Sequence, residues 1–243
     1  MNIDIQKNGK LLGIEAGKKA ASIIRATIAE KGAANIILAT GASQFETLKQ
    51  LATEKGIDWG KVVMFHLDEY IGLPEDHKAS FRKYLRERFL DKLPDLKNAF
   101  LIDGEVNIGV ELERLNQAIL SHPIDLALVG IGENGHLAFN DPPADFEISE
   151  PYIVAELDLR SRQQQVNEGW FDNLDQVPKT AISMSIKQIM QSDSIICSVP
   201  DLRKAPAVRD CFKNEVSTMY PSSILQLHHK CFVYLEESSA SLL

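Results

Sequence analysis

The sequence predicts an α/β protein with a mainly parallel sheet and helices on both faces. Short β-branched apolar runs alternate with amphipathic helical patterns along the chain. Parallel strands need a right-handed crossover between them, which a helix usually provides. No low-complexity linker, fixed repeat or Gly/Ser/Pro-rich break divides the 243 residues, so we expect one domain covering residues 1–243.

The first elements set this alternation. A helix is predicted from Leu12 to Ile28, where apolar side chains recur three and four residues apart, and Gly32 marks its end. The apolar run 35–40 is too short for a helix and indicates a strand. A tight turn at Gly41 and a helical pattern over 45–51 follow it.

The same strand and helix unit recurs through the rest of the chain. Further strands are predicted at 62–65, 99–102 and 124–129, and helices at 80–90 and 110–120. The second half is less regular, with predicted strands at 152–157, 181–184, 194–199 and 231–235 and a helix at 203–212. These elements predict a Rossmann-like αβα architecture.

Composition excludes several classes of protein. With 44% apolar and 25% charged residues the chain can bury a core, and a net charge of −8 disfavours partners such as nucleic acid or an anionic membrane surface. Cys197, Cys211 and Cys231 form no C-x-x-C pair, so we expect buried thiols. No apolar run approaches the about 18 residues of a membrane helix, and no leader pattern opens the chain, so we expect a cytoplasmic protein.

Ligands of such folds bind at the carboxyl ends of the strands, which directs attention to the turn Thr40-Gly41-Ala42-Ser43. Free backbone N–H groups and the positive end of the following helix favour an anion such as phosphate there, and two hydroxyls add donors. In the alternative interpretation, Gly41 is present because the turn needs its backbone conformation, and Ser43 only caps the helix. No Gly-Lys-Ser/Thr follows, so a nucleoside triphosphate is not indicated.

Two adjacent acids, Asp68 and Glu69, follow the predicted strand at 62–65. Alternation along a continuous strand would place His66 and Asp68 on one face. A carboxylate partly withdrawn from water can remove a proton from a carbon next to a carbonyl group. A helix cap or an exposed acidic pair is the alternative interpretation.

A glycine-rich turn, Gly130-Ile-Gly-Glu-Asn-Gly135, follows the predicted strand at 124–129 and matches G-x-G-x-x-G. It does not predict a dinucleotide cofactor, because that fingerprint must open a full crossover helix. Pro142 and Pro143 come too soon after Gly135 for such a helix.

His136 follows the turn directly, between Asn134 and Asp141. This arrangement predicts a general acid/base unit, because a neighbouring acceptor orients the imidazole and, if charged, raises its pKa. A lone packed histidine in a loop is the alternative.

Two longer stretches, Leu67-Asp-Glu-Tyr-Ile-Gly-Leu-Pro74 and Gly132-Glu-Asn-Gly-His-Leu-Ala-Phe-Asn-Asp-Pro142, resemble motifs of the glucosamine-6-phosphate deaminase/isomerase family. Shorter matching pieces are Leu38-Ala-Thr-Gly41, Val177-Pro-Lys-Thr-Ala181, Lys204-Ala205 and Leu225-Gln-Leu-His228. A sister family, the 6-phosphogluconolactonases, shares the fold but typically carries Asp-Gly-His-Thr-Ala-Ser and lacks Asp-Glu-Tyr-x-Gly-Leu-Pro. The resemblance therefore favours the deaminase branch.

The resemblance implies conversion of an aminosugar phosphate to fructose 6-phosphate and ammonia, without a metal or organic cofactor. By this analogy Asp68 moves a proton between two carbons of an enolamine, and His136 opens the pyranose ring by passing a proton to its oxygen. Asn134 and Asp141 would orient the histidine. The phosphate would be held by Thr40, Gly41, Ala42, Ser43 and Lys204.

The sequence departs from the family pattern around the histidine. Many members have Asp where Asn134 stands and Glu where Asp141 stands. An amide can orient an imidazole but does not stabilise its cation as a carboxylate would. Asp141 is therefore expected to be the only charged helper of His136.

A second departure concerns phosphate. Many relatives place Arg immediately before an aromatic pair, whereas Gly169 precedes Trp170-Phe171 here. We expect Arg162, or else Arg160, to supply that charge. Ala42 stands where a second glycine is usual, which still leaves the backbone approachable.

Other functions remain as alternatives. One is isomerisation or lactone hydrolysis of a non-amino sugar phosphate, and another is a non-catalytic sugar-phosphate sensor. A metal site of His66, Asp68, Glu69 and His136 lacks any recognised ligand spacing. The expected partner is a small phosphorylated aminosugar; a homo-oligomer is left open, and allosteric control is not carried over.

Overall fold

The computed structural model describes residues 1–243 and contains two sheets. Seven strands form the larger one: β1 (Asn2–Gln6), β2 (Ala34–Leu38), β3 (Val62–His66), β5 (Asn98–Phe100), β6 (Leu126–Val129), β9 (Ser194–Val199) and β10 (Cys231–Glu236). Their order is β1-β10-β9-β6-β2-β3-β5, and every neighbouring pair is parallel. The predicted α/β class with a mainly parallel sheet is confirmed.

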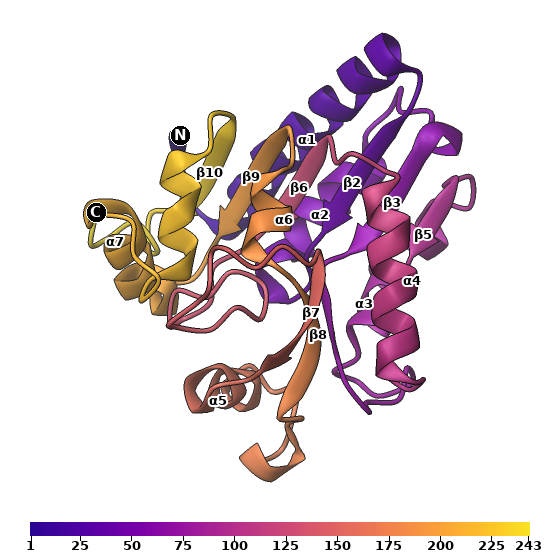
Figure 1. Cartoon of the computed structure of the whole chain (residues 1–243). Helices are drawn as coiled ribbons and strands as arrows, with labels where there is room; N and C mark the ends of the chain where they lie inside the picture. Colours follow the sequence, from indigo (N-terminus) through magenta and orange to yellow (C-terminus); the bar gives the residue numbers. More distant parts are fainter.

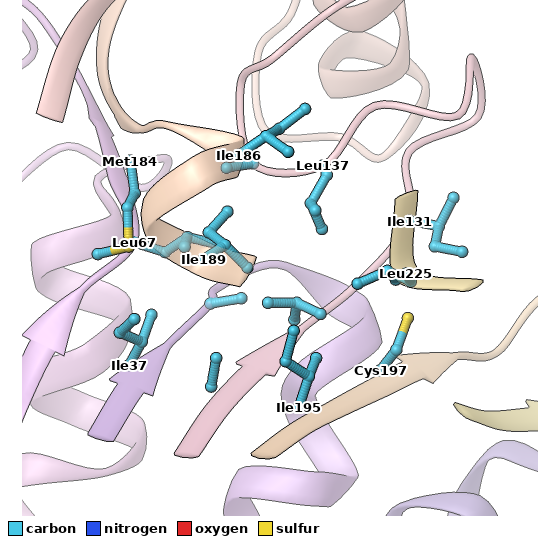
Figure 2. Packing of buried hydrophobic residues seen from close by; sticks show 14 of the residues in the cluster. Ile37, Leu67, Ile131, Leu137, Met184, Ile186, Ile189, Ile195, Cys197 and Leu225 are labelled. Carbon is cyan, nitrogen blue, oxygen red and sulfur yellow. The ribbon is translucent and has the colours of Figure 1, made fainter. Parts of the chain in front are cut away.

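Helices cover both faces of this sheet (Figure 1). They are α1 (Gly9–Lys31), α2 (Phe45–Thr53), α3 (Phe81–Arg88), α4 (Ile108–Leu120), α6 (Ile186–Met190) and α7 (Ala205–Lys213). One more helix, α5 (Leu159–Asn167), lies away from this sheet, near the bottom of the view in Figure 1. One apolar cluster joins the sheet to α1, α2 and α3, and a second joins its other face to α4, α6 and α7. Figure 2 shows part of the second cluster, in which α6, with Ile186 and Ile189, lies over the strands that carry Ile37 (β2) and Ile195 (β9).

Strand β2 shows how the sequence builds these two layers. Its side chains alternate between the clusters, with Ile37 in one and Ile36 and Leu38 in the other. A strand covered on both faces reads as a continuous apolar run, which is how the segment was predicted.

The second sheet is small and antiparallel. Strands β4 (Asp68–Tyr70), β8 (Thr180–Met184) and β7 (Tyr152–Glu156) lie side by side in that order. In Figure 1 β7 and β8 project from the larger sheet toward the bottom of the view. The chain changes sheets at Leu67, between β3 and β4, so the predicted alternation of His66 and Asp68 along one strand does not hold.

The order of the strands places a switch point between β2 and β6. From β2 the chain proceeds to β3 and β5 on one side, and β6 then returns to pair with β2 on the other. A crevice forms outside the carboxyl ends of two such strands. The turns at 40–43 and 130–136 follow these two strands and therefore face the same crevice.

Two further expectations concern burial and membranes. Cys197, Cys211 and Cys231 are free and buried, as predicted. None of the helices combines the length and the apolar composition that crossing a lipid bilayer requires.

Candidate active site

A cavity of about 530 Å³ opens at the switch point. It is lined by the turn 40–43, by Asp68, by the turn that carries His136, and by Arg203 and Lys204. Its volume is in the range of small-molecule sites. Four segments far apart in the sequence therefore meet around one space.

The turn after β2 presents backbone N–H groups to this cavity. Gly41 has a φ of 89°, a left-handed conformation that glycine adopts without strain. The carbonyl of Gly41 accepts the Tyr84 hydroxyl at 3.1 Å and the N–H of Gln44 at 3.1 Å. The N–H groups of Ala42 and Ser43 have no backbone acceptor, so they are free to bind an anion.

Lys204 brings a positive charge to the same cavity from the start of α7. Its side chain is buried, and this burial lowers its pKa, while the nearby carboxylates of Glu168 and Glu133 act in the opposite direction. A buried ammonium group beside free N–H groups favours a phosphate ligand. Lys204 and the turn 40–43 therefore line the same cavity.

The structure does not bring Arg162 to the cavity. Its guanidinium donates to the carbonyls of Leu174 at 2.6 Å and Val177 at 3.1 Å, so it fastens α5 to the segment that follows. Arg160 is exposed and does not line the cavity either. Arg203 is the arginine that does, and it lies in an ion pair with Asp201 at 2.6 Å.

Asp68 lies at the start of β4 and borders the cavity. It is 6% exposed. Burial, with a smaller contribution from the carboxylate of Glu69, raises the pKa of Asp68 to about 8. A carboxyl group with a pKa near neutrality can both accept and return a proton under physiological conditions.

The neighbouring acid, Glu69, has a structural role. Its carboxylate accepts the N–H groups of Tyr70 at 2.9 Å, Phe81 at 3.3 Å and Arg82 at 2.8 Å, and the Ser80 hydroxyl at 3.1 Å. These bonds hold the first turn of α3 against β4. Of the two adjacent acids, only Asp68 borders the cavity.

His136 is held by a carboxylate on one side of its ring. Nδ1 lies 3.2 Å from Oδ1 of Asp141 and 2.9 Å from the Ser161 hydroxyl. An ionised carboxylate only accepts hydrogen bonds, so Nδ1 carries the proton and Nε2 is the nitrogen available to a ligand. A Cβ at Gly132 would lie 2.2 Å from Cε1 of His136, so the ring position requires glycine there.

Asp141 reaches the imidazole despite being one methylene shorter than Glu. Burial acts to raise the pKa of Asp141, but hydrogen bonds from His136, Ser161 and Asn134 outweigh it and leave the pKa well below its usual range. The carboxylate is therefore charged beside the ring, where it stabilises an imidazolium.

Asn134 acts on the histidine through Asp141. Its amide donates to Oδ1 of Asp141 at 2.8 Å and to Asp158 at 3.2 Å, and its oxygen accepts the backbone N–H of His136 at 3.1 Å. It orients the carboxylate and the turn, while Asp141 orients the ring.

Two members of this network were missed by sequence reasoning. The Ser161 hydroxyl donates to Asp141 in a short hydrogen bond, and Asp158 accepts the N–H of Ser161 at 2.6 Å as the N-cap of α5. The spacing Asp158-x-x-Ser161 is a helix-start pattern, so it signals the cap but not the contact with the turn.

The metal ligands considered above do not converge. His66 is fully buried, its Nδ1 accepts the Ile102 N–H at 3.5 Å, and it does not line the cavity. The carboxylate of Glu69 is occupied by the start of α3. No group of three or more His, Cys, Asp or Glu side chains is placed to hold a metal ion.

A family model and the curated relatives of this chain name the same group of sugar-phosphate enzymes. Residues 8–234 match the family model described as glucosamine-6-phosphate isomerases/6-phosphogluconolactonase. The glucosamine-6-phosphate deaminase of Oenococcus oeni is 36% identical over 231 residues, which are 95% of each chain. That of Lactobacillus delbrueckii subsp. bulgaricus is 33% identical over 244 residues and the full length of both.

Solved structures agree with this result. A monomeric glucosamine-6-phosphate deaminase superposes with a TM-score of 0.89 at 29% identity, covering 100% of both chains. A putative 6-phosphogluconolactonase from Neisseria gonorrhoeae shares the fold with a TM-score of 0.76 at 19% identity, covering 98% of this chain and 100% of its own. The chain therefore belongs to the glucosamine-6-phosphate isomerase/6-phosphogluconolactonase family.

Proposed function

We propose that the protein is a hexosamine-6-phosphate deaminase that converts glucosamine 6-phosphate and water to fructose 6-phosphate and ammonia. The observation that carries the proposal is that Asp68 and His136 border one cavity together with an anion-binding turn and Lys204. Relatives named glucosamine-6-phosphate deaminase, at 36% and 33% identity over nearly the whole chain, support the same reaction.

Binding of the phosphate group positions the substrate in the cavity. The phosphate is bound by the free N–H groups of the turn 40–43, by the hydroxyls of Thr40 and Ser43, and by the ammonium group of Lys204. The backbone donors are held by the turn before the substrate arrives, which keeps the entropy loss on binding small. The anchored phosphate leaves the other end of the sugar to reach Asp68 and His136.

His136 opens the pyranose ring. Nε2 removes the proton of the C1 hydroxyl and gives it to the ring oxygen as the C1–O5 bond breaks, which leaves an aldehyde. Asp141 stabilises the imidazolium that forms in between.

Asp68 then moves a proton between two carbons. Its carboxylate takes the proton from C2, the released electron pair forms the C1=C2 bond, and the aldehyde oxygen takes a proton from the ammonium group at C2, which gives an enolamine. Return of the proton from Asp68 to C1 leaves an iminium group at C2. Water adds to C2, both of its protons pass to the nitrogen, and ammonia leaves as ammonium while the ketose phosphate remains.

We further propose that the 243 residues act as one domain and one copy. Strands β1 and β10, from the two ends of the chain, pair in one sheet, which supports a single domain. The monomeric deaminase among the structural relatives supports this view. Three unpaired thiols support the cytoplasm as the place of action.

The test is to incubate the purified protein with glucosamine 6-phosphate and measure ammonia and fructose 6-phosphate together. We expect equal amounts of both products, undiminished by EDTA, and no turnover by the Asp68→Asn variant. The proposal is contradicted if neither glucosamine 6-phosphate nor galactosamine 6-phosphate releases ammonia.

A substrate panel separates the alternatives. Isomerisation of a neutral hexose 6-phosphate or hydrolysis of 6-phosphogluconolactone, without ammonia from any aminosugar, would indicate the other reactions of the family. Stabilisation against heat by sugar phosphates without any turnover would indicate a sensor.

A further inference from the structure

Glu168 is a carboxylate of the cavity wall that the reaction described above does not use. It directly follows α5, and both of its oxygens are fixed. Nε2 of Gln164 donates to Oε1 at 2.8 Å, and the indole Nε1 of Trp170 donates to Oε2 at 3.2 Å. Both donors are neutral, so they orient the carboxylate without neutralising its charge.

Gln164 also fixes Glu168 relative to the turn that carries His136. The amide oxygen of Gln164 accepts the backbone N–H of Glu133 at 3.0 Å, while its nitrogen binds Glu168. Gln164 is buried and itself lines the cavity. The carboxylate is thus held in place by the same turn that holds the imidazole.

The charge of Glu168 acts on both ends of the cavity. At the phosphate end it partly offsets the effect of burial, which lowers the pKa of Lys204. On the side of β4, Phe171 of the same segment packs edge-on against Tyr70, two residues from Asp68, with 5.6 Å between the ring centroids. Burial raises the pKa of Tyr70, and the charges of Asp68, Glu69 and Glu168 add to that rise. Glu168 therefore lies within electrostatic reach of the phosphate anchor and of the surroundings of the proton-transfer group.

The expected substrate has matching charges. An aminosugar 6-phosphate is negative at the phosphate and, as the ammonium form, positive at C2. Asp68 has to take and return a proton, so it cannot remain a constant counter-charge for that ammonium. A neutral hexose phosphate of the same shape has a hydroxyl at C2, which donates a hydrogen bond to a nearby carboxylate but brings no opposite charge to it.

We propose that Glu168 determines substrate specificity by recognising the positively charged amino group, and so favours aminosugar phosphates over neutral hexose phosphates. This inference rests on the proposed function. Attraction between opposite charges is stronger in a cavity than in bulk water. Because the carboxylate is already fixed, little side-chain entropy is lost when the amino group binds.

The test compares two open-chain ligands that differ only at C2. These are 2-amino-2-deoxyglucitol 6-phosphate and glucitol 6-phosphate, with dissociation constants measured by calorimetry at pH 7. We expect the wild type to bind the amino compound more tightly. Glu168→Gln should weaken the amino compound about tenfold and change the neutral one less than twofold.

Two further variants complete the experiment. Glu168→Asp restores the charge and should recover part of the preference for the amino compound. Glu156→Gln removes one negative charge from an exposed position of β7 and should leave the preference unchanged. Binding of the neutral compound shows that each variant retains a folded cavity.

The outcomes distinguish this inference from the function itself. If the wild type binds both ligands and Glu168→Gln leaves the preference intact, or weakens both ligands equally, Glu168 does not recognise the amino group. If the wild type binds neither ligand, the proposed function fails instead.

Discussion

Replacing Asp68 by asparagine should stabilise the folded protein at neutral pH while it abolishes turnover. Burial raises the pKa of Asp68 from its ordinary 3.8 to about 8, so the folded protein holds this proton more tightly than the unfolded chain. Keeping the carboxyl group in the fold is therefore unfavourable wherever the unfolded chain would release the proton. An amide of nearly the same shape has no charge to bury.

The size of the effect follows from the two pKa values. Between its ordinary pKa of 3.8 and pH 7, the Asp68 carboxyl group is ionised in the unfolded chain but still protonated in the fold. Over this range of about three pH units the free energy of unfolding falls by about 1.4 kcal/mol per unit. The product, about 4 kcal/mol, is an upper limit, because the side chain borders the cavity and water reaches it. We expect Asp68→Asn to raise the free energy of unfolding at pH 7 by about 2 to 4 kcal/mol, or Tm by about 4 to 16 °C.

The pH dependence identifies the cause. The unfavourable contribution is absent below about pH 4, where the carboxyl group is protonated in both states, and it grows until about pH 8. Urea unfolding of wild type and variant at a series of pH values should show a difference that is small at pH 4 and largest near pH 8. Asp76→Asn, at an exposed position, is the control and should show no such trend. A gain in stability that is the same at all pH values, or a loss at pH 7, would refute the reasoning.

Three further substitutions test the other parts of the site. His136→Gln should lower kcat/KM for glucosamine 6-phosphate by about 10²- to 10⁴-fold and should spare proton exchange on open-chain substrates; equal losses on both would contradict the ring-opening role. Lys204→Ala should raise KM at least about tenfold with a smaller change in kcat, since the proposed contact of the lysine with phosphate would be the same in ground state and transition state; a loss confined to kcat would argue against this. Arg162→Ala should lower the free energy of unfolding by about 1 to 3 kcal/mol and leave KM within about threefold, because its guanidinium binds carbonyls of its own chain. A large rise in KM at unchanged stability would instead indicate that Arg162 binds the phosphate.

Local patterns were sufficient to predict most of the fold. The helix from Leu12 to Ile28 lies within α1, and the apolar run 35–40 contains most of β2. β1 was missed because its burial pattern is mostly exposed, and its stability comes from pairing with β10 at the far end of the chain. Such a partner cannot be inferred from neighbouring residues.

The second sheet shows a different limit. The strands at 152–157 and 181–184 were predicted, but their antiparallel pairing with each other and with β4 was not. β4 is only three residues long and continues almost directly from β3, so sequence spacing alone gives no sign that the chain changes sheets at Leu67. Long-range packing determines that change.

The site was predictable where a motif was dense and not where single side chains crossed between segments. Asp68, His136 and the turn at 40–43 lie in or next to recognisable motifs, and the structure brings them to one cavity. Ser161 and Glu168 reach the site from α5 and the residue after it, through contacts that depend on how α5 lies beside the turn. The packing of α5 also explains why the prediction for Arg162 was wrong. It directs the guanidinium away from the cavity, to the carbonyls of Leu174 and Val177.

The two sheets supply different parts of the site. The turn 40–43, which we propose binds the phosphate, and the imidazole of His136 both follow strands of the seven-stranded sheet, whereas Asp68 lies on the three-stranded one. A change in β4 can therefore alter which bond of a sugar phosphate reacts, while the groups proposed to bind its phosphate stay in place. This modularity gives a physical route by which one scaffold could diverge into enzymes that isomerise and enzymes that open lactones.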